Sequence, residues 1–220
     1  MTKRQNLFQN AITAILVVCA VLIAGVAVHR EFFRRSAPLV TGHISNWQSL
    51  LADRHPSLGK ANASLKIIEF SDYQCPFCKN LEPKLRELVK RYPARLAVVR
   101  YDLPLSIHAQ AFIAAIAARC AALQDVYEPF ESELFHDSER LQVLDWNQLA
   151  RRANVPNVAR FSSCLQYKKT TASVSADVAT AAKLGIKTTP VLVIDGNVVP
   201  GTHSERDLDG LIRAALAKQD

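Results

Sequence analysis

Two cysteines three positions apart, Cys75 and Cys78, carry the clearest chemistry in the chain. They come directly after a predicted strand and open a predicted helix, and Pro76 suits the first helical position. Unpaired N–H groups and the positive end of the helix dipole stabilise a thiolate there. We therefore expect the pKa of Cys75 to lie below the free value of about 8.5. Cys78 lies in the first turn and can displace a partner bound to Cys75, which predicts a redox-active pair.

The same spacing also occurs in zinc sites, which need two further ligands in a similar grouping. The sequence offers no second Cys-x-x-Cys and no Cys-x-x-His, and its histidines show no spacing typical of a ligand set or of a Ser-His-Asp arrangement. A purely structural disulfide is disfavoured because a bridge between residues three apart closes almost no loop. We therefore expect neither a metal nor an organic cofactor.

The elements that must position the pair begin with a strand and a helix on either side of it. Residues 64–70 are β-branched and aromatic enough for a buried strand, and residues 76–91 place apolar side chains on one helical face. A second strand is predicted at 95–101. A strand, a crossover helix and a second strand form a βαβ unit, which predicts a parallel pair and an α/β fold class.

The rest of the chain divides into a helical middle and a strand-rich end. Residues 106–182 are alanine-rich, with helical spacing at 111–123, 141–153 and 171–182, and we interpret them as a helical insertion. A strand at 191–194, a turn at Asp195 and Gly196, a strand at 198–199 and a helix at 205–217 follow.

An apolar segment near the N-terminus predicts a membrane anchor. About eighteen residues, 11–28, would extend roughly 27 Å as a helix, close to the hydrocarbon thickness of a bilayer. Lys3 and Arg4 precede the segment, as in a signal peptide or a signal anchor. An anchor is favoured because the run is longer than a usual signal-peptide core, although cleavage stays open. We interpret Cys19 as an apolar filler of this span.

Length and composition bound the organisation and exclude some partners. With 220 residues, 49% of them hydrophobic and 21% charged, the chain has room for one folded domain and an appendage. We divide it into an anchor at 1–30, a linker with a short helix at 31–61 and a domain at 62–220. The net charge of +7 is scattered, so we expect a solvated basic surface and no nucleic-acid partner.

The stretch from Phe70 through Ser71, Asp72, Tyr73 and Gln74 to Cys75, Pro76, Phe77 and Cys78 resembles the active site of DsbA-like thioredoxin-fold thiol–disulfide oxidoreductases. The likeness extends to Pro83, five residues after the second cysteine, and to the run Thr188-Thr189-Pro190 before a strand and hairpin. It also extends to the helical insertion, and so covers roughly Trp47 to Ala217. The resemblance implies a thioredoxin fold with an inserted α-helical domain, here preceded by one N-terminal transmembrane helix.

The resemblance assigns further site residues. Pro190 would be cis, so that the backbone of Thr189 pairs with a substrate strand beside the disulfide, where Phe77 also contacts substrate. An ordinary trans-proline opening an edge strand is the alternative. Glu69 stands where DsbA-like proteins have a buried acid near the resolving cysteine, and it could take the proton from Cys78. An acid that faces solvent is the alternative.

Two features of the insertion also follow from the resemblance. Some DsbA-like proteins carry a second disulfide in this domain, and Cys120 and Cys164 would form it. Two buried free thiols are the alternative. His108 falls in a region that lies near the active site in such folds, but we expect it to be a solvated residue at a helix start.

One departure from the family pattern concerns redox strength. The dipeptide between the cysteines is Pro76-Phe77, whereas strongly oxidising DsbA proteins have Pro-His. Phe77 supplies no positive charge beside the thiolate. We therefore expect the pKa of Cys75 to be lowered, but less than in DsbA, where it is about 3.5.

The predicted function is disulfide exchange with exported protein substrates outside the cytoplasm, most simply as an oxidant. We expect a single-pass protein of the inner membrane, with its catalytic domain in the periplasm and a membrane redox partner that recycles the cysteine pair. A reductase or isomerase of the same fold is the first alternative. A non-catalytic chaperone that holds unfolded chains beside Pro190 is the second.

Overall fold

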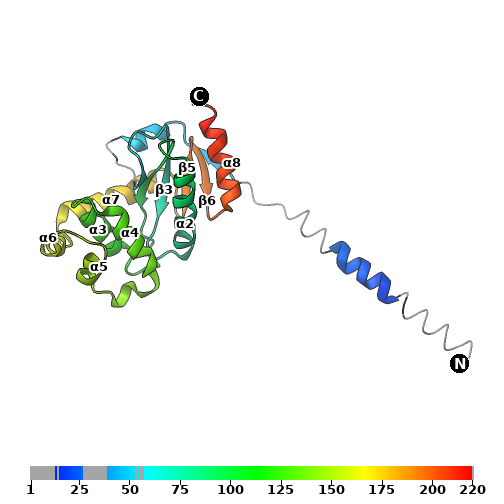
Figure 1. Cartoon of the computed structure of the whole chain (residues 1–220), viewed down its shortest axis with the longest axis horizontal. Coiled ribbons are helices and arrows are strands. Elements are labelled where there is room, and N and C mark those ends of the chain that lie inside the picture. Colours follow the sequence, from blue (N-terminus) through cyan, green and yellow to red (C-terminus); the bar gives the residue numbers. More distant parts are fainter. Residues whose placement is uncertain (1–12, 14, 27–38, 53, 55–56, 220) are drawn as a thin grey trace, which may run out of the picture. The chain divides into compact units, whose positions relative to one another are not determined.

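The computed structural model describes residues 13, 15–26, 39–52, 54 and 57–219. Contacts divide the chain into two units, Met1–Pro38 and Leu39–Asp220, and the second unit contains the sheet and the helices that bear on the site. Its helices and strands are coloured along the sequence in Figure 1.

The second unit is built on a six-stranded sheet of order β1-β6-β5-β3-β4-β2. Its centre is the predicted βαβ unit, since β3 and β4 pair in parallel across the helix α2. All other neighbouring strands are antiparallel. The bounds are Gly42–His43 for β1, Leu58–Gly59 for β2, Leu65–Ser71 for β3, Pro76–Arg91 for α2, Leu96–Asp102 for β4, Val191–Ile194 for β5 and Asn197–Pro200 for β6.

The strands alternate between two apolar faces, as side chains of period two must. One face carries Ile67 and Leu192 and is covered by α2 and by α8, Glu205–Leu216, whose Leu85 and Ile212 reach it. The opposite face is covered by the short 3-10 helix η1, Trp47–Leu51, and by α7, Lys168–Lys183. The sheet is therefore buried between two helical layers.

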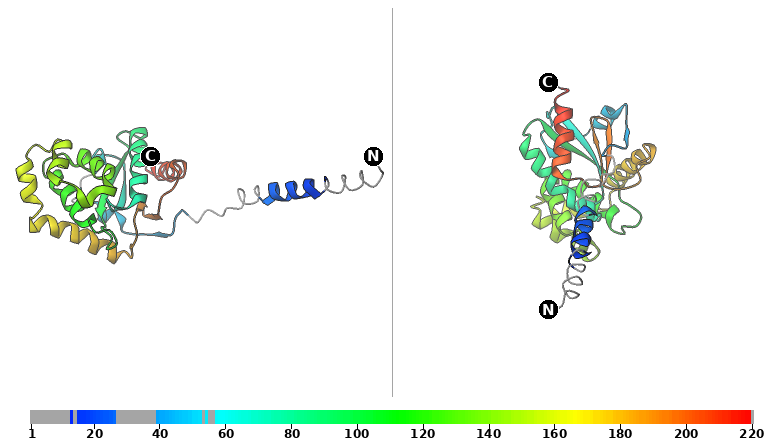
Figure 2. Two further views of the ribbon diagram at one scale, coloured as in Figure 1. Left: turned by 90° about the horizontal axis from the view of Figure 1, so that it is seen from below. Right: turned by 90° about the vertical axis from the view of Figure 1, so that its right-hand side faces the viewer.

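The insertion between β4 and β5 is helical, as predicted. It comprises α3 (Ala111–Ala122), α4 (Tyr127–His136), η2 (Ser138–Val143), α5 (Trp146–Arg152), α6 (Val158–Cys164) and α7. In Figures 1 and 2, α3 to α6 gather on the side of the sheet away from α8. Their apolar core also includes Tyr73, Cys75 and Cys78, so the insertion packs against the start of α2.

The insertion differs from its sequence prediction at α4, at α6, which lies outside the predicted helical ranges, and at the helix expected at 141–153. Helix α4 was not predicted, because Pro129 and three glutamates interrupt its apolar pattern; Phe130 and Leu134 nevertheless bury one face. The helix expected at 141–153 is split into η2 and α5. Asp145 causes the break, because its side chain accepts hydrogen bonds from the N–H groups of Asn147 and Gln148 and so starts a new helix.

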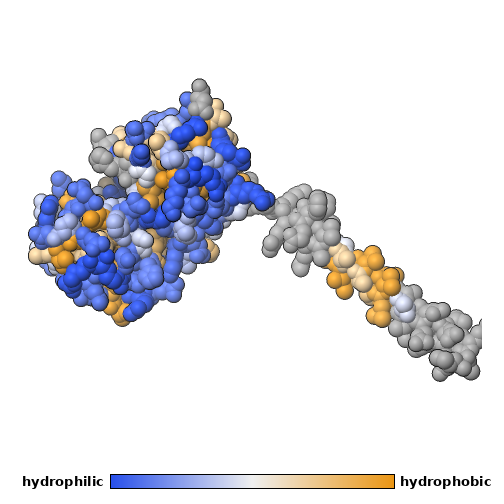
Figure 3. All heavy atoms as spheres, viewed as in Figure 1, coloured by the Kyte–Doolittle hydropathy of each residue, from blue (hydrophilic) through white to orange (hydrophobic). Residues whose placement is uncertain are grey.

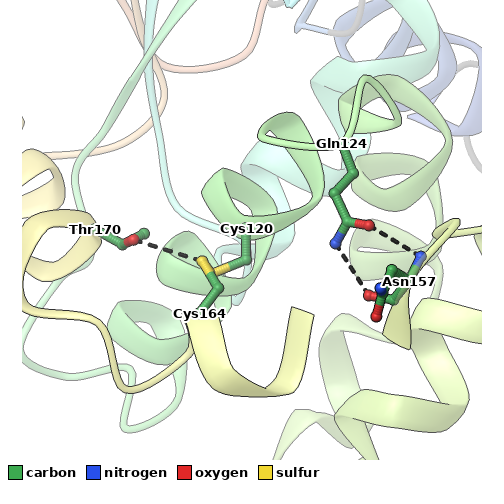
Figure 4. Close-up of a disulfide and its surroundings, with 5 residues drawn as sticks. All are labelled: Cys120, Gln124, Asn157, Cys164 and Thr170. Atoms are coloured by element: carbon green, nitrogen blue, oxygen red, sulfur yellow. Dashed lines mark hydrogen bonds between the residues drawn. A yellow bond between two sulfur atoms is a disulfide. The ribbon is translucent and has the colours of Figure 1, made fainter. Parts of the chain in front are cut away.

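The insertion also contains a disulfide, between Cys120 on α3 and Cys164 on α6 (Figure 4). Thr170 lies 3.5 Å from the Cys164 sulfur. Nearby, Gln124 donates to the carbonyl of Asn157 and accepts from its N–H, at 3.1 and 2.9 Å. The two helices are thus joined by a covalent bond beside a reciprocal hydrogen-bonded pair.

Residues 42–43 and 58–59, in the segment predicted as a linker, form two short strands of the sheet. β1 pairs with β6 and β2 pairs with β4, so both short segments extend the sheet at its edges. The short helix was predicted around Trp47 and is η1, with Trp47 and Leu50 buried against the sheet. Strands of two residues have too little pattern to be recognised in the sequence.

The predicted hairpin is present between β5 and β6. Asp195 and Gly196 have φ of 50° and 81°, the positive values that a tight two-residue turn requires. Gly196 also lies under His43 and Trp47, where a Cβ would come within 2.4 Å of the His43 ring. Glycine is therefore required at this position for two reasons.

In the first unit, residues 15–26 are helical and their large apolar side chains are exposed, from 57% at Val17 to 69% at Ile23. Apolar residues dominate the visible face of this helix in Figure 3, whereas hydrophilic residues dominate the visible face of the second unit. Among the described residues, no helix has both the length and the apolar character needed to cross a bilayer. Residues 11, 12, 14, 27 and 28 of the predicted span lie outside the described part.

Candidate active site

Cys75 is held at the N-terminus of α2, where the turn after β3 places it. It is the N-cap residue, with φ −73° and ψ 118°, and Pro76 begins the helix. Its N–H donates to the carbonyl of Asp72 at 3.1 Å, which closes the turn. Cys75 is only 3% exposed and Cys78, one turn into the helix, is fully buried. Both are free thiols in this structure.

The surroundings of Cys75 favour its thiolate. The Cys78 thiol donates to its sulfur, and the backbone N–H groups of Cys78 and Phe77 also point at it, which together lower the pKa of Cys75 to about 5. Burial opposes this shift and is outweighed. The value lies between that of a free thiol and that of DsbA, as expected from a helix start without a neighbouring histidine.

The pKa of Cys78 shifts in the opposite direction. Burial raises it, because a second thiolate would be desolvated beside the first. The hydrogen bond that the Cys78 thiol donates to Cys75 and the nearby Glu69 raise it further. The outer sulfur is therefore the nucleophile and leaving group of the pair, and the inner sulfur holds the proton.

Glu69 is fully buried in β3, which excludes the interpretation that it faces solvent. The strand alternation points it to the face covered by α2, beneath Cys78. Arg100 of β4 donates to its carboxylate from Nε at 3.0 Å, and also donates to Glu82 of α2 at 2.9 Å. Burial raises the pKa of Glu69 although Arg100 opposes the shift. The residue is thus a buried acid that charges reluctantly, next to the inner thiol.

The peptide bond between Thr189 and Pro190 is cis, which excludes the trans alternative. Both residues are buried, and the carbonyl oxygen of Thr189 lies 3.5 Å from the Cys75 sulfur. Pro190 leads directly into β5, which pairs with β3, and Cys75 follows β3 in the chain, so the same sheet positions both segments. Two segments more than a hundred residues apart therefore meet at one sulfur.

A groove of about 640 Å³ opens beside Cys75. Its walls come from the start of α2, the loop after β4, the cis-proline loop and the end of β6. Phe77 is 58% exposed and Ile107 is 80% exposed along it. The lining residues are Cys75, Pro76, Phe77, Leu105, Ile107, His108, Thr188, Thr189, Pro200, Gly201 and Thr202.

The structure adds two residues that sequence reasoning did not assign to the site. His108 lines the groove, and its side chain is only 18% exposed, so the expectation of a solvated residue was wrong. Its ring nitrogen Nδ1 lies 2.7 Å from the carboxylate of Asp72. The position of Asp72, three residues before Cys75, was the available signal, but nothing local in the sequence connects it with His108.

Cys120 and Cys164, by contrast, lie away from the groove and are joined to each other. The structure therefore brings Cys75, Cys78, Glu69, Phe77, Thr189 and Pro190 to one place and leaves the second cysteine pair in the insertion. Of the two alternatives for that pair, free thiols are excluded.

The comparisons with known proteins agree with this geometry. The family described as thioredoxin matches residues 52–214. The catalytic domain of Proteus mirabilis ScsC superposes with a TM-score of 0.66 at 22% identity, covering 79% of this chain and 96% of that domain. Pseudomonas aeruginosa DsbA2 superposes with a TM-score of 0.53 at 25% identity, covering 71% and 91%.

The curated relatives are much longer proteins, and this chain matches only one part of each. The Na(+)/H(+) antiporter NhaA 3 of Salinispora tropica is 28% identical over 166 residues, which make up 75% of this chain and 25% of that protein. The chain thus spans about a quarter of the length of the curated relatives that it matches.

Proposed function

The chain belongs to the thioredoxin family, and we propose that it is a thiol–disulfide oxidoreductase of the DsbA type that donates disulfides to exported proteins through Cys75 and Cys78. The observation that carries the proposal is the asymmetry of the two thiols. Cys75 has a pKa of about 5 and contacts the cis-proline loop, whereas the pKa of Cys78 is raised by burial.

In the oxidised protein, a substrate thiolate attacks the sulfur of Cys75 from the groove. The bond between Cys75 and Cys78 breaks, and its electron pair goes to the Cys78 sulfur. Because the pKa of Cys78 is raised, this sulfur takes up a proton, which Glu69 beneath it donates. The products are a mixed disulfide on Cys75 and a protonated Cys78.

The second substrate thiolate then attacks the substrate sulfur of the mixed disulfide. Cys75 leaves as a thiolate, which is stable at neutral pH because its pKa is about 5. A low pKa of the leaving thiol speeds this step and stabilises the reduced protein, so it favours the donor direction over the reductase direction. The reduced pair then needs an external oxidant, for which we propose a membrane redox partner.

Substrate binding is assigned to the groove and to the cis-proline loop. An extended substrate segment would pair with the backbone of Thr189, which lies two residues before β5. The apolar side chains of Phe77 and Ile107 would contact side chains on either side of the substrate cysteine. This arrangement suits unfolded chains, whose apolar residues are still exposed.

We propose that residues 1–30 anchor the protein in the inner membrane and leave the catalytic domain in the periplasm. The helical residues 15–26 with exposed apolar side chains support this placement. A neighbour of similar fold is described as a periplasmic thioredoxin-like protein of Salmonella enterica, at 22% identity. An oxidising compartment is also where a disulfide donor can work.

The test is the pH profile of iodoacetamide alkylation of the reduced protein, read by mass mapping. Only the thiolate reacts, so we expect the rate at Cys75 to rise through a pH of about 5 and to be constant above about 6. Cys78 should stay unmodified. A Cys75 rate that rises only above a pH of about 8 would refute the proposed chemistry.

The direction of disulfide exchange is tested separately, by trapping the redox state of Cys75 and Cys78 in cells. A donor should be recovered mainly oxidised, and a Cys75→Ser variant should fail to oxidise a dithiol peptide. Recovery of a mainly reduced pair would instead support a reductase or isomerase. A Cys75→Ser variant that holds an unfolded chain as well as the wild type does would support a chaperone.

A further inference from the structure

The active-site groove contains an imidazole as well as a thiol. Of the residues that line it, Cys75 and His108 carry the ionisable groups, and the other side chains are apolar or hydroxylic. A substrate thiol that enters this groove must lose its proton before it attacks the disulfide. An alkyl thiol has a pKa of about 8.5, so most of it is protonated at neutral pH.

The imidazole of His108 is hydrogen-bonded to the buried carboxylate of Asp72, which also accepts hydrogen bonds from two backbone N–H groups. Asp72 is 1% exposed, and it accepts hydrogen bonds from the N–H of Gln74 at 2.7 Å and of Leu105 at 2.8 Å. It also accepts from Nδ1 of His108 at 2.7 Å. Nδ1 therefore carries the proton of the neutral ring, and Nε2 carries the lone pair.

From this geometry we infer that His108 is the proton acceptor for the thiol of the substrate, with Asp72 as its positioning residue. The inference rests on the proposed function and assigns a second role in the same site. The carboxylate holds Nδ1, which leaves Nε2 as the nitrogen that can face a molecule in the groove. Because Cys75 and His108 line the same groove, a substrate that reaches the Cys75 sulfur occupies the groove into which the ring faces.

The step balances as a proton transfer coupled to thiol exchange. Nε2 takes the proton from the substrate thiol while its sulfur forms a bond to Cys75. The bond between Cys75 and Cys78 breaks, and Cys78 receives the electron pair and a proton from Glu69. In the reverse direction, the protonated ring of His108 donates to the alkyl thiolate as it leaves the mixed disulfide.

A different role is that the pair only fastens the loop after β4 to the turn before α2. The leaving thiolate distinguishes the proton-transfer role of His108 from the structural role, when the reduced protein reacts with a disulfide. An aryl thiolate is stable without a proton, whereas an alkyl thiolate gains from one. Loss of a proton donor therefore slows only the alkyl reaction, and loss of a structural contact slows both.

The test measures two rates for the reduced full-length protein at neutral pH, with dithiobis(nitrobenzoate) and with oxidised glutathione. His108→Asn is the informative variant, because the asparagine amide can still donate to Asp72 where Nδ1 does. We expect its glutathione reaction to slow by about tenfold or more and its aryl reaction to change by less than about twofold. Asp72→Asn should also slow the glutathione reaction more than the aryl reaction, because the neutral amide no longer stabilises the protonated ring of His108 through its charge.

The control variant is His136→Asn, since His136 is exposed at the end of α4. It should change neither rate. Equal slowing of both reactions in a His108→Asn protein that melts like the wild type, or no slowing of either, overturns the inference. A different result would overturn the proposed function: a wild-type protein that reacts with dithiobis(nitrobenzoate) and with oxidised glutathione no faster than free cysteine does.

Discussion

Phe77 stands between the two cysteines, beside a thiolate that only neutral groups stabilise. The Cys78 thiol and the backbone N–H groups of Phe77 and Cys78 act on Cys75, and no cation is among the main causes of its lowered pKa. The Phe77 ring instead lies half exposed along the groove. This residue thus gives up electrostatic stabilisation of the thiolate and offers an apolar surface to substrate.

Phe77→His should make the disulfide of Cys75 and Cys78 a stronger oxidant. An imidazolium beside Cys75 favours the thiolate, so its pKa should fall below about 5, and each pKa unit corresponds to about 30 mV of potential. The shift should grow as pH falls through about 6.5, because only the protonated ring is charged. Equilibration with glutathione buffers measures the potential. Phe77→Gln, which is polar but uncharged, should stay near the wild type; an equal shift in both variants would contradict the charge argument.

Glu69→Gln should slow the steps that move a proton to or from Cys78. The amide cannot exchange a proton, so we expect resolution of a mixed disulfide on Cys75 by Cys78 to slow by about tenfold or more at neutral pH. Quenched-flow mass spectrometry measures this rate. Glu131→Gln is the matched control, because Glu131 is also buried and pairs with Arg100 but is not among the main causes of the raised pKa of Glu69 or of Cys78. Equal rates in Glu69→Gln and the wild type would remove Glu69 from the mechanism.

At the scale of elements, the site depends on how the insertion is fastened to the sheet. Asp177 of α7 is fully buried, and it forms ion pairs with Arg54 and with Arg119 of α3. It also accepts from the N–H of Asp102, at the end of β4, at 2.9 Å. These contacts join both ends of the insertion to the strand that precedes it. The loop that carries His108 lies between these fixed points.

The disulfide between Cys120 and Cys164 should stabilise the insertion without affecting the chemistry at Cys75. It spans 44 positions, and chain entropy for a loop of that length gives about 4 kcal/mol at 25 °C. In a Cys75→Ser/Cys78→Ser background, Cys120→Ala/Cys164→Ala should lower the free energy of unfolding by about 2 to 5 kcal/mol. Urea unfolding measures the loss.

The same alanine pair placed in the wild-type background is the functional control for this disulfide. Its alkylation profile at Cys75 should still rise through a pH of about 5, because the groups that lower that pKa belong to α2 and to Thr189 and not to the insertion. A profile displaced toward the value of a free thiol would mean that the disulfide positions the site.

At the scale of the whole molecule, two units of opposite surface character share one chain. The helical residues 15–26 expose apolar side chains over every turn, whereas the second unit has its apolar residues in three cores. Isolated apolar residues on the second unit, such as Leu123 and Val143, are separated by polar ones. This contrast supports the proposal that residues 15–26 contact lipid while the second unit lies in water.

The anchor proposal predicts that Leu16→Arg/Leu22→Arg releases the protein from membranes. Each arginine at the centre of a span costs about 2.5 to 3.5 kcal/mol of insertion free energy. Carbonate extraction of the full-length chain measures the fraction that stays in the membrane pellet. Leu123→Arg/Val143→Arg adds the same charge to exposed positions of the second unit and should not change that fraction. Equal retention of both variants would exclude residues 15–26 as the anchor.

The sequence alone was sufficient for features that depend on short-range pattern. The strand before Cys75, the helix after it and the Asp195-Gly196 turn follow from residue spacing, because period and turn chemistry are local properties. The direction of the Cys75 pKa shift was equally accessible, since it arises from the start of one helix. The match to the thioredoxin family then agrees with the interpretation of those motifs.

The tertiary structure decided what depends on residues distant in sequence. The edge strands at 42–43 and 58–59 exist because β6 and β4 offer them partners, and the opposite signs of the two cysteine pKa shifts require the burial that the insertion provides. Asp72 and His108 are 36 positions apart and meet only because β3 and β4 end at the same edge of the sheet. No local pattern records such a pairing, since it arises from the geometry of packing rather than from the spacing of neighbours.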